Sequence, residues 1–118
     1  MTVQSYAVID PRALVDGEIE GHELGAGVSL IFVDLPPGAG VRLHRHAYQE
    51  VFVVREGRAT YRVGSETLEV EAPRIVVVEA GVAHGFVNSG DGPLRQVDIH
   101  VSDRIVTEWL ENRVDEEG

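Results

Sequence analysis

Residues 38–57 read Gly38-Ala-Gly-Val-Arg-Leu-His44-Arg-His46-Ala-Tyr-Gln-Glu50-Val-Phe-Val-Val-Arg-Glu-Gly57. His44 and His46 are two positions apart, so on a β-strand their imidazole rings leave the same face. Glu50 follows after a short turn and opens a second apolar run, and a third histidine, His84, comes much later. Three imidazoles and one carboxylate can hold a divalent transition metal ion and leave coordination positions open for a substrate.

Length and composition narrow the possible classes of protein. The chain has 118 residues, of which 43% are apolar and 25% charged, which is typical of one globular domain. It contains no cysteine, so any metal must be held by histidine and carboxylate. The net charge of −10 argues against nucleic acid as a partner. With neither a secretory signal nor an apolar run of the roughly 18 residues that span a membrane, we expect a cytoplasmic protein without a membrane partner.

Strand patterns follow one another along most of the chain and are separated by Gly, Pro and polar turns, which predicts an all-β sandwich or barrel. A helix is predicted only over about 103–113, where Ile105, Val106, Trp109 and Leu110 form an apolar stripe and Trp109 would pack the helix on the barrel. An acidic tail, 114–118, follows. The predicted strands are Val3–Ile9, Val28–Leu35, Val41–His46, Val51–Arg55, Arg58–Val63, Leu68–Val70, Ile75–Glu79, Phe86–Asn88 and Leu94–Val101.

Two of these strands are apolar on both faces. They read Val51-Phe-Val-Val54 and Ile75-Val-Val-Val78. One face of each strand would point into the barrel, and the other must be covered by a second sheet, the C-terminal helix or another subunit. Together with the apolar segment Val3–Ile9, these strands predict a homodimer.

At these positions the chain resembles the cupin superfamily. The first cupin motif is Gly, five residues, His-x-His, three or four residues, Glu, six residues and Gly, and Gly38, His44, His46, Glu50 and Gly57 fit it without a gap. In the second motif Gly81, His84 and Asn88 fit, while Pro73 and Glu79 stand where Gly and Pro are expected. Both departures fall in turns and leave every candidate ligand in place.

The resemblance implies one cupin domain over 1–118, a double-stranded β-helix or jelly-roll barrel, with motif 1 at about 38–57 and motif 2 at about 73–88. It also implies one divalent metal ion, Mn, Fe, Ni, Cu, Co or Zn, held by His44, His46, Glu50 and His84. The fold alone does not select an activity, because cupins include dioxygenases, isomerases, decarboxylases, storage proteins and sensing domains.

Four other side chains are candidates for the same cavity. Arg42 shares strand parity with His44 and could bind a substrate carboxylate at the cavity mouth, or could be a solvated rim residue. Tyr48 lies between two candidate ligands and could donate a proton to the substrate, or could serve packing. Phe52 and Phe86 share parity with Glu50 and His84, so we expect them to form an apolar, substrate-binding wall.

The last predicted strand leaves two orientations open. Its residues Gln96, Asp98 and His100 lie on one face and Val97, Ile99 and Val101 on the other. The ordinary orientation places the apolar face inward and the polar triplet outside. With the polar face inward, His100 would become a candidate general acid or base.

Two classes of function follow. The first is an enzyme that acts on a small organic molecule by metal-dependent oxygenation, as a dioxygenase, or by metal-assisted proton transfer, as an isomerase. The second is a non-catalytic module that binds or senses a small molecule. An enzyme needs an orienting or acid–base group beyond the ligands, and the sequence offers Arg42, Tyr48 and His100 for this.

Overall fold

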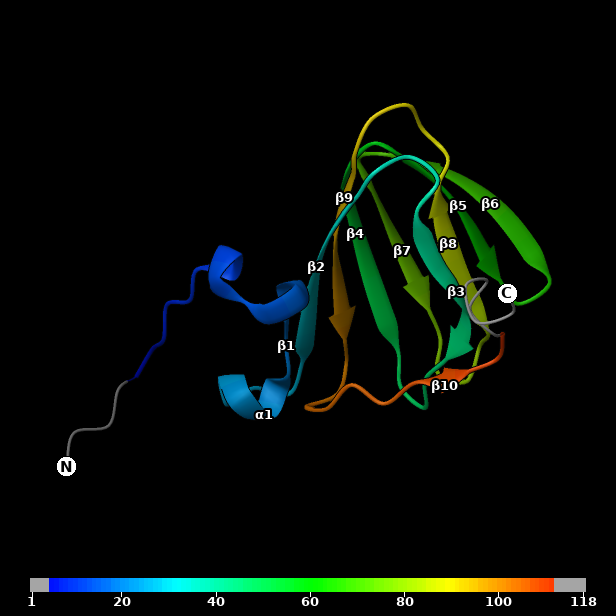
Figure 1. Ribbon diagram of the computed structural model, residues 1–118. Helices are drawn as coiled ribbons and strands as arrows, with labels where there is room; N and C mark the ends of the chain where they lie inside the picture. The colour runs from blue at the N-terminus through cyan, green and yellow to red at the C-terminus, as the bar shows by residue number, and fades with distance from the viewer. Residues whose placement is uncertain (1–4, 112–118) are drawn as a thin grey trace, which may run out of the picture.

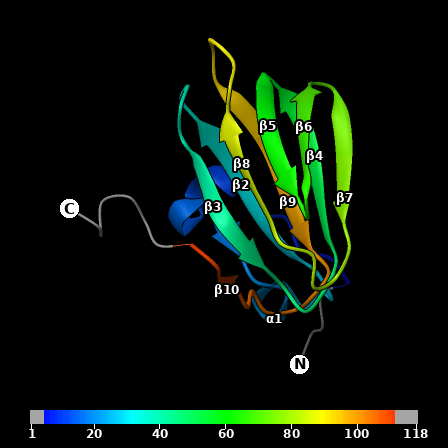
Figure 2. The same ribbon diagram turned by 90° about the vertical axis from the view of Figure 1, so that its right-hand side faces the viewer.

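The computed structural model describes residues 5–111 and consists of two antiparallel five-stranded sheets that face each other (Figures 1 and 2). This confirms the expected all-β, two-sheet fold. The first sheet has the order β1-β2-β9-β4-β7, with β1 Glu18–Ile19, β2 Ser29–Leu35, β9 Leu94–His100, β4 Glu50–Glu56 and β7 Arg74–Val78. The second has the order β10-β3-β8-β5-β6, with β10 Glu108–Trp109, β3 Gly40–Arg45, β8 His84–Asn88, β5 Arg58–Val63 and β6 Glu66–Glu71.

The hydrophobic core fills the space between the two sheets. Alternate residues of each strand point inward, as the two-residue period of a strand requires. On β5, for example, Ala59 and Tyr61 are fully buried, whereas Arg58 and Arg62 are exposed. The buried apolar residues are Phe52, Val54, Ala59, Tyr61, Val70, Val78, Phe86 and Leu94.

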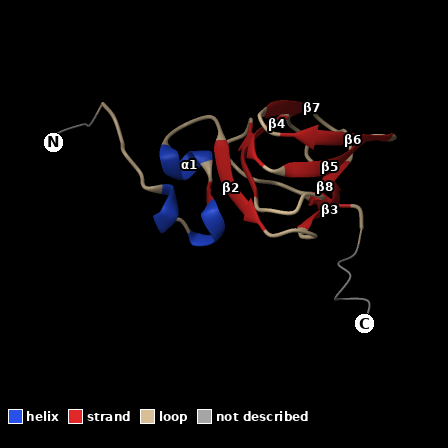
Figure 3. Cartoon of the chain, turned by 90° about the horizontal axis from the view of Figure 1, so that it is seen from above, coloured by secondary structure: helices blue, strands red, loops and turns tan. Residues whose placement is uncertain are grey.

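The N-terminal part of the described chain lies outside the barrel. Two short 3₁₀ turns, η1 Pro11–Ala13 and η2 Val15–Gly17, and one short helix, α1 Gly21–Leu24, gather beside β2 (Figure 3). The predicted strand Val3–Ile9 differs from the structure: residues 5–10 belong to no strand, and Val3 lies outside the described residues. None of the helices within residues 5–111 is long and apolar enough to cross a membrane.

Within the described residues the predicted C-terminal helix is not present. Residues 103–111 instead form a bend at 103–104 followed by a non-helical segment that includes the short strand Glu108–Trp109, while 112 and 113 and the acidic tail 114–118 lie outside the described residues. We call residues 101–111 the strap, because they run along the end of the barrel where β3 ends and β4 begins (Figure 1). Its short strand β10 pairs with the edge of β3, and Leu110 N–H donates to the Leu43 carbonyl at 3.0 Å. The unpaired backbone groups of an edge strand therefore override the helical spacing of the apolar residues.

A β-bulge changes the direction of side chains within β3. Val41 pairs with Phe86 and His44 with His84, so three steps on β3 match two on β8. Gly85 lies opposite the bulge, where a Cβ atom would meet the Val41 carbonyl oxygen at 2.8 Å. The extra residue breaks the alternation on which the predicted orientation of Arg42 depends.

Candidate metal centre

Four ligand-type side chains meet at the end of the barrel that the strap crosses. His44 comes from β3, His46 from the turn after it, Glu50 from the start of β4, and His84 from the start of β8. Each is at most 5% exposed. One ligand atom from each lies within 4.8 Å of the ligand atoms of the other three. Such a buried cluster suggests a metal site.

The Glu50 carboxylate is at the centre of the cluster. Its Oε1 atom is 3.0 Å from His84 Nε2 and 3.1 Å from His46 Nε2. Its Oε2 atom is 3.2 Å from Nε2 of a further histidine, His100. Three imidazoles therefore face one carboxylate that is almost fully buried.

The outer nitrogen of each candidate ligand ring is held by a backbone carbonyl. His44 Nδ1 donates to the Arg42 carbonyl at 2.7 Å, His84 Nδ1 to the Val82 carbonyl at 2.9 Å, and His46 Nδ1 to the Val106 carbonyl at 2.8 Å. A carbonyl can only accept, so in the neutral rings the proton is on Nδ1 and the lone pair is on Nε2. This is the arrangement that metal-binding histidines have.

The residues fit a cation. Neutral Nε2 atoms present lone pairs toward a carboxylate that is itself negative, and a cation between them turns this repulsion into attraction. Among residues 5–111, His46 Nε2 and His100 Nε2 are both fully buried and have no hydrogen-bond partner. A donor set of imidazole nitrogen and carboxylate oxygen suits divalent transition metals.

Burial and neighbouring charges shift the pKa values of the cluster in different directions. Burial opposes the charge of Glu50, but His46 and His84 beside it outweigh burial and lower its pKa to about 2. Burial lowers the pKa of His44 to about 4. Burial also opposes protonation of His46, but the Glu50 carboxylate and the Val106 carbonyl outweigh it and raise the pKa of His46 above 6.5. The carboxylate is therefore ionised and His44 neutral near pH 7, while His46 competes for a proton.

The ordinary orientation expected for the last strand is wrong. Gln96, Asp98 and His100 on β9 point inward and are buried, whereas Val97, Ile99 and Val101 face outward. The reason is the register with β4, since Glu50 pairs with His100 and Phe52 with Asp98. Directly paired residues share a face, so β9 follows the inward face of β4.

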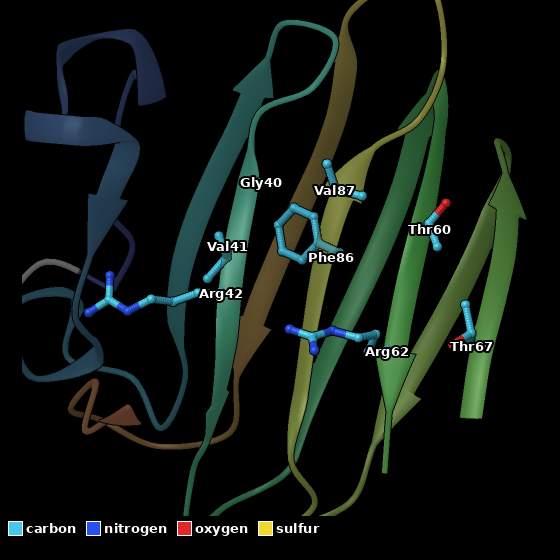
Figure 4. Close-up of a pocket in the computed structure, with 8 residues that line it drawn as sticks. All are labelled: Gly40, Val41, Arg42, Thr60, Arg62, Thr67, Phe86 and Val87. Atoms are coloured by element: carbon cyan, nitrogen blue, oxygen red, sulfur yellow. The ribbon is translucent and has the colours of Figure 1, made fainter. Parts of the chain in front are cut away.

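The Tyr48 side chain reaches the histidine cluster, whereas the Arg42 side chain points away from it. The Tyr48 hydroxyl lies 2.8 Å from His100 Nδ1, and burial raises the pKa of Tyr48 to about 12. The Arg42 guanidinium lies 4.0 Å from the ring centroid of Trp109, and its Nε donates to the Glu111 carbonyl. Arg42 borders a groove of about 400 Å³ along β3, β8 and β5, together with Arg62 (Figure 4). The bulge in β3 thus separates Arg42 from the parity of His44.

Phe52 and Phe86 belong to the core below the cluster. Phe52 is 1% exposed, and its ring centroid lies 5.7 Å from that of His84. Phe86 packs on Tyr61, with a centroid distance of 5.2 Å. The two rings therefore support the base of the cluster as packed core residues.

Several groups near the cluster had no sequence signal. Val106 contacts two site residues through its peptide groups, which a side-chain pattern does not record. Trp109, expected as a helix anchor, is 48% exposed and lies 5.1 Å from the His44 ring. A recess of about 310 Å³ reaches His46 between the strap and the barrel; it is lined by Arg45, His46, Ala47, Gly81, Val106 and Glu108.

A second polar group lies deeper in the barrel. Tyr61 O–H donates to Gln96 Oε1 at 2.7 Å, and Gln96 Nε2 donates to Asp98 Oδ1 at 2.8 Å. Burial raises the pKa of Asp98 well above its ordinary value, and the nearby charge of Glu50 adds to this. The inward orientation of β9 thus gives the barrel a polar interior along one wall.

Comparison with known families and proteins agrees with this geometry. A family model described as a cupin domain matches residues 31–100. An uncharacterised protein of Streptomyces coelicolor is 51% identical over 41 residues, which are 35% of this chain and 39% of that protein. The chain thus spans well under half the length of this relative.

Solved structures show the same fold. An uncharacterised Klebsiella pneumoniae protein with a double-stranded β-helix domain is 24% identical, with a TM-score of 0.67 over 73% of this chain and 76% of that one. Bacillus subtilis oxalate decarboxylase, studied for its Mn(II) centres, is 23% identical, with a TM-score of 0.73 over 79% of this chain and 27% of that one. At these identities the likeness concerns the fold.

Proposed function

We propose, from the premise that this chain belongs to the cupin domain family, that it binds one divalent transition metal and acts on a small organic molecule. The observation that carries the proposal is the buried convergence of His44, His46, Glu50 and His84. Three Nε2 lone pairs and one carboxylate oxygen would hold the metal. When bound, the metal would supply a Lewis acid or an oxygen-binding centre to a metal-dependent oxygenation or a proton transfer.

A small substrate with a carboxylate or similar oxygen donor would suit such a metal site. Four protein ligands leave open positions on a six-coordinate metal, and the recess beside His46 gives a route toward the cluster. The Mn(II) centres of the oxalate decarboxylase with the same fold make Mn²⁺ and oxalate the first probes to use. Tyr48 and His100 are the polar groups beside the ligands that would orient a bound substrate or exchange a proton with it.

Water-proton relaxation of the Mn²⁺-loaded, untagged protein tests this function. We expect Mn²⁺ to bind stoichiometrically and to relax water strongly, because open positions hold exchanging water. Added oxalate should then lower the relaxation by displacing that water. A Mn²⁺-loaded protein whose relaxation does not respond to oxalate or to other small carboxylates would contradict the proposed substrate class.

Assays of chemistry then separate the two classes of function. Consumption of O₂, release of CO₂ or isomerisation of the carboxylate would support an enzyme. Displacement of water without any conversion would support the alternative, a binding or sensing module. The latter is favoured by the strap, which covers a cluster whose residues are at most 5% exposed.

We also propose that the chain forms a homodimer through the outer face of the first sheet. Two rows of apolar residues cross this face, one residue from each of four strands, through direct cross-strand pairing. The rows are Ile75-Val53-Val97-Phe32 and Val77-Val51-Ile99-Leu30. Ile75 is 67% and Val77 50% exposed. A contiguous apolar face of this kind is typical of an interface, and its pleated surface is suited to a second copy of itself.

Sedimentation equilibrium at micromolar concentration tests the dimer. We expect a dimer for the unchanged protein and a monomer for Val77→Arg, because the arginine would bury an unpaired charge at the interface. Val87→Arg is the matched control, since Val87 is 37% exposed on the second sheet. An unchanged protein that sediments only as a monomer would contradict the proposal.

A further inference from the structure

His100 is a fourth imidazole at the cluster, and its place differs from that of the other three. It is 2% exposed, and its pairing with Glu50 across β9 and β4 places both side chains on the same inward face. Its Nε2 atom lies 3.2 Å from Glu50 Oε2, whereas His46 and His84 approach Oε1. His100 thus faces the side of the carboxylate that the other histidines leave free.

The partner of its outer nitrogen is also different. In His44, His46 and His84 the Nδ1 atom meets a backbone carbonyl, which fixes the proton on Nδ1. In His100 the Nδ1 atom meets the Tyr48 hydroxyl at 2.8 Å. A hydroxyl can donate as well as accept, so its other contacts decide the direction of this hydrogen bond.

Tyr48 already accepts a hydrogen bond from the strap. The Val106 N–H donates to the Tyr48 oxygen at 3.2 Å. The hydroxyl proton then has His100 Nδ1 as its acceptor, and within residues 5–111 it has no other. With Nδ1 as the acceptor the hydroxyl proton has a partner, which it would lack if Nδ1 were the donor; the proton of the ring is then on Nε2.

We infer that His100 is a positioning residue: its protonated Nε2 lies 3.2 Å from Glu50 Oε2, outside hydrogen-bond geometry, attracts that oxygen electrostatically, and is not itself a metal ligand. Oε1 then remains directed at the space between His46 and His84, so Glu50 would bind a metal through one oxygen. This inference deepens the proposed function and rests on it only in taking Glu50 as a ligand. It leaves the open coordination positions to substrate, since a proton blocks the fourth imidazole.

One residue of the strap, Val106, contacts both His46, protonated on Nδ1, and the Tyr48 hydroxyl that sets the opposite tautomer of His100. The Val106 carbonyl takes the Nδ1 proton of His46, which frees His46 Nε2 for the metal. The N–H of Val106 goes to Tyr48, whose hydroxyl in turn fixes His100 with Nε2 protonated. One peptide segment on the strap thus makes one histidine a ligand and another a positioning residue.

Nuclear magnetic resonance of ¹⁵N-histidine-labelled protein reads these tautomers directly. Two-bond ¹H–¹⁵N correlation patterns distinguish a ring protonated on Nδ1 from one protonated on Nε2. We expect the Nε2–H pattern for His100 with and without diamagnetic Zn²⁺, and Zn²⁺-dependent shifts of Nε2 in the other three rings. A metal-induced shift of His100 Nε2, or an Nδ1–H pattern for His100, would overturn the inference.

The same spectra separate this inference from the proposed function. If Zn²⁺ shifts none of the rings, the proposed metal site fails, while the tautomer of His100 is still measured in the metal-free protein. Tyr48→Phe removes the hydroxyl that fixes His100, so its spectrum should become a mixture of tautomers. A spectrum identical to that of the unchanged protein would contradict the role of Tyr48.

Mn²⁺ affinity gives a second reading. His100→Leu should weaken binding roughly 10–100-fold, the usual effect of removing a polar group that orients a ligand. His100→Gln places an amide N–H near the position of Nε2–H and should retain most of the affinity. Equal losses in both variants would mean that His100 acts only by filling space, and would contradict a positioning role.

Discussion

Replacing His46 with alanine should weaken metal binding by more than about 100-fold, because removing a direct ligand exceeds the 10–100-fold effect of losing a ligand's hydrogen-bond partner. The fold should survive, since His46 lies in the turn after β3 and is not one of the buried apolar residues that form the core. Mn²⁺ titration followed by metal analysis of the untagged protein measures the loss, and circular dichroism checks the fold.

A matched control is available in another group of acidic and histidine side chains. His22 lies beside Glu20 and Glu23 at α1, where the side chains of His22 and Glu20 are 35% and 32% exposed. His22→Ala should leave the affinity unchanged. If His46→Ala keeps full occupancy, or if both variants lose metal equally, the metal is not held by the buried cluster.

The same titration should depend on pH in one direction. The pKa of His46 is raised above 6.5, mainly by the neighbouring Glu50 carboxylate acting against burial. A metal needs the neutral ring, so lowering the pH from 7 to 5 adds one competing proton and should weaken binding by up to about tenfold per pH unit. Glu50 and His44, with pKa values of about 2 and about 4, add little competition in this range. An affinity that stays flat would exclude His46 as a ligand.

Replacing Phe52 with alanine should lower the free energy of unfolding by about 3–5 kcal/mol, the usual loss for a large buried aromatic residue. Phe52 is 1% exposed, and its ring packs edge-on against Tyr61 and Phe86 at centroid distances of 5.3 and 6.0 Å. Such a loss is a large part of the roughly 5–15 kcal/mol by which small domains are stable. Urea denaturation of the metal-free protein measures it, at one fixed concentration because dimerisation raises apparent stability.

Val8→Ala is the control for this measurement. Val8 is 88% exposed and lies outside every strand, so its truncation should change the unfolding free energy by less than about 0.5 kcal/mol. A loss below about 1 kcal/mol for Phe52→Ala would mean that the ring borders an open cavity, as a substrate-binding wall would, and not a packed core.

The sequence alone predicted the all-β fold, the family and the residues that gather at the cluster. These predictions depend on local spacing. His44 and His46 are two apart, Glu50 is four further on, and glycines mark the turns around them. Such spacings place side chains relative to their own strand and to the next one, whatever the rest of the chain does.

Other features depended on which backbone groups pair between distant segments. Residues 103–111 have a helical apolar pattern, yet the free edge of β3 binds them as a non-helical strap. Arg42 shares the parity of His44 in the sequence, but the bulge opposite Gly85 changes its direction. In each case a hydrogen bond across the fold overrides a side-chain periodicity, because buried or edge backbone groups must find partners.

The role of His100 shows the same division most clearly. The sequence of β9 is compatible with either face pointing inward. Only the register with β4, in which Glu50 pairs with His100, turns Gln96, Asp98 and His100 inward. The proton of His100 is placed by Tyr48, which in turn is held by the backbone of Val106, 58 positions away along the chain.

Residue types and short spacings thus determined which groups could be ligands. The tautomer of a histidine is set by the partner of its other nitrogen. For His44 and His84 this partner is a carbonyl two residues away, whereas for His46 and His100 only the tertiary structure supplied it, through Val106 and Tyr48.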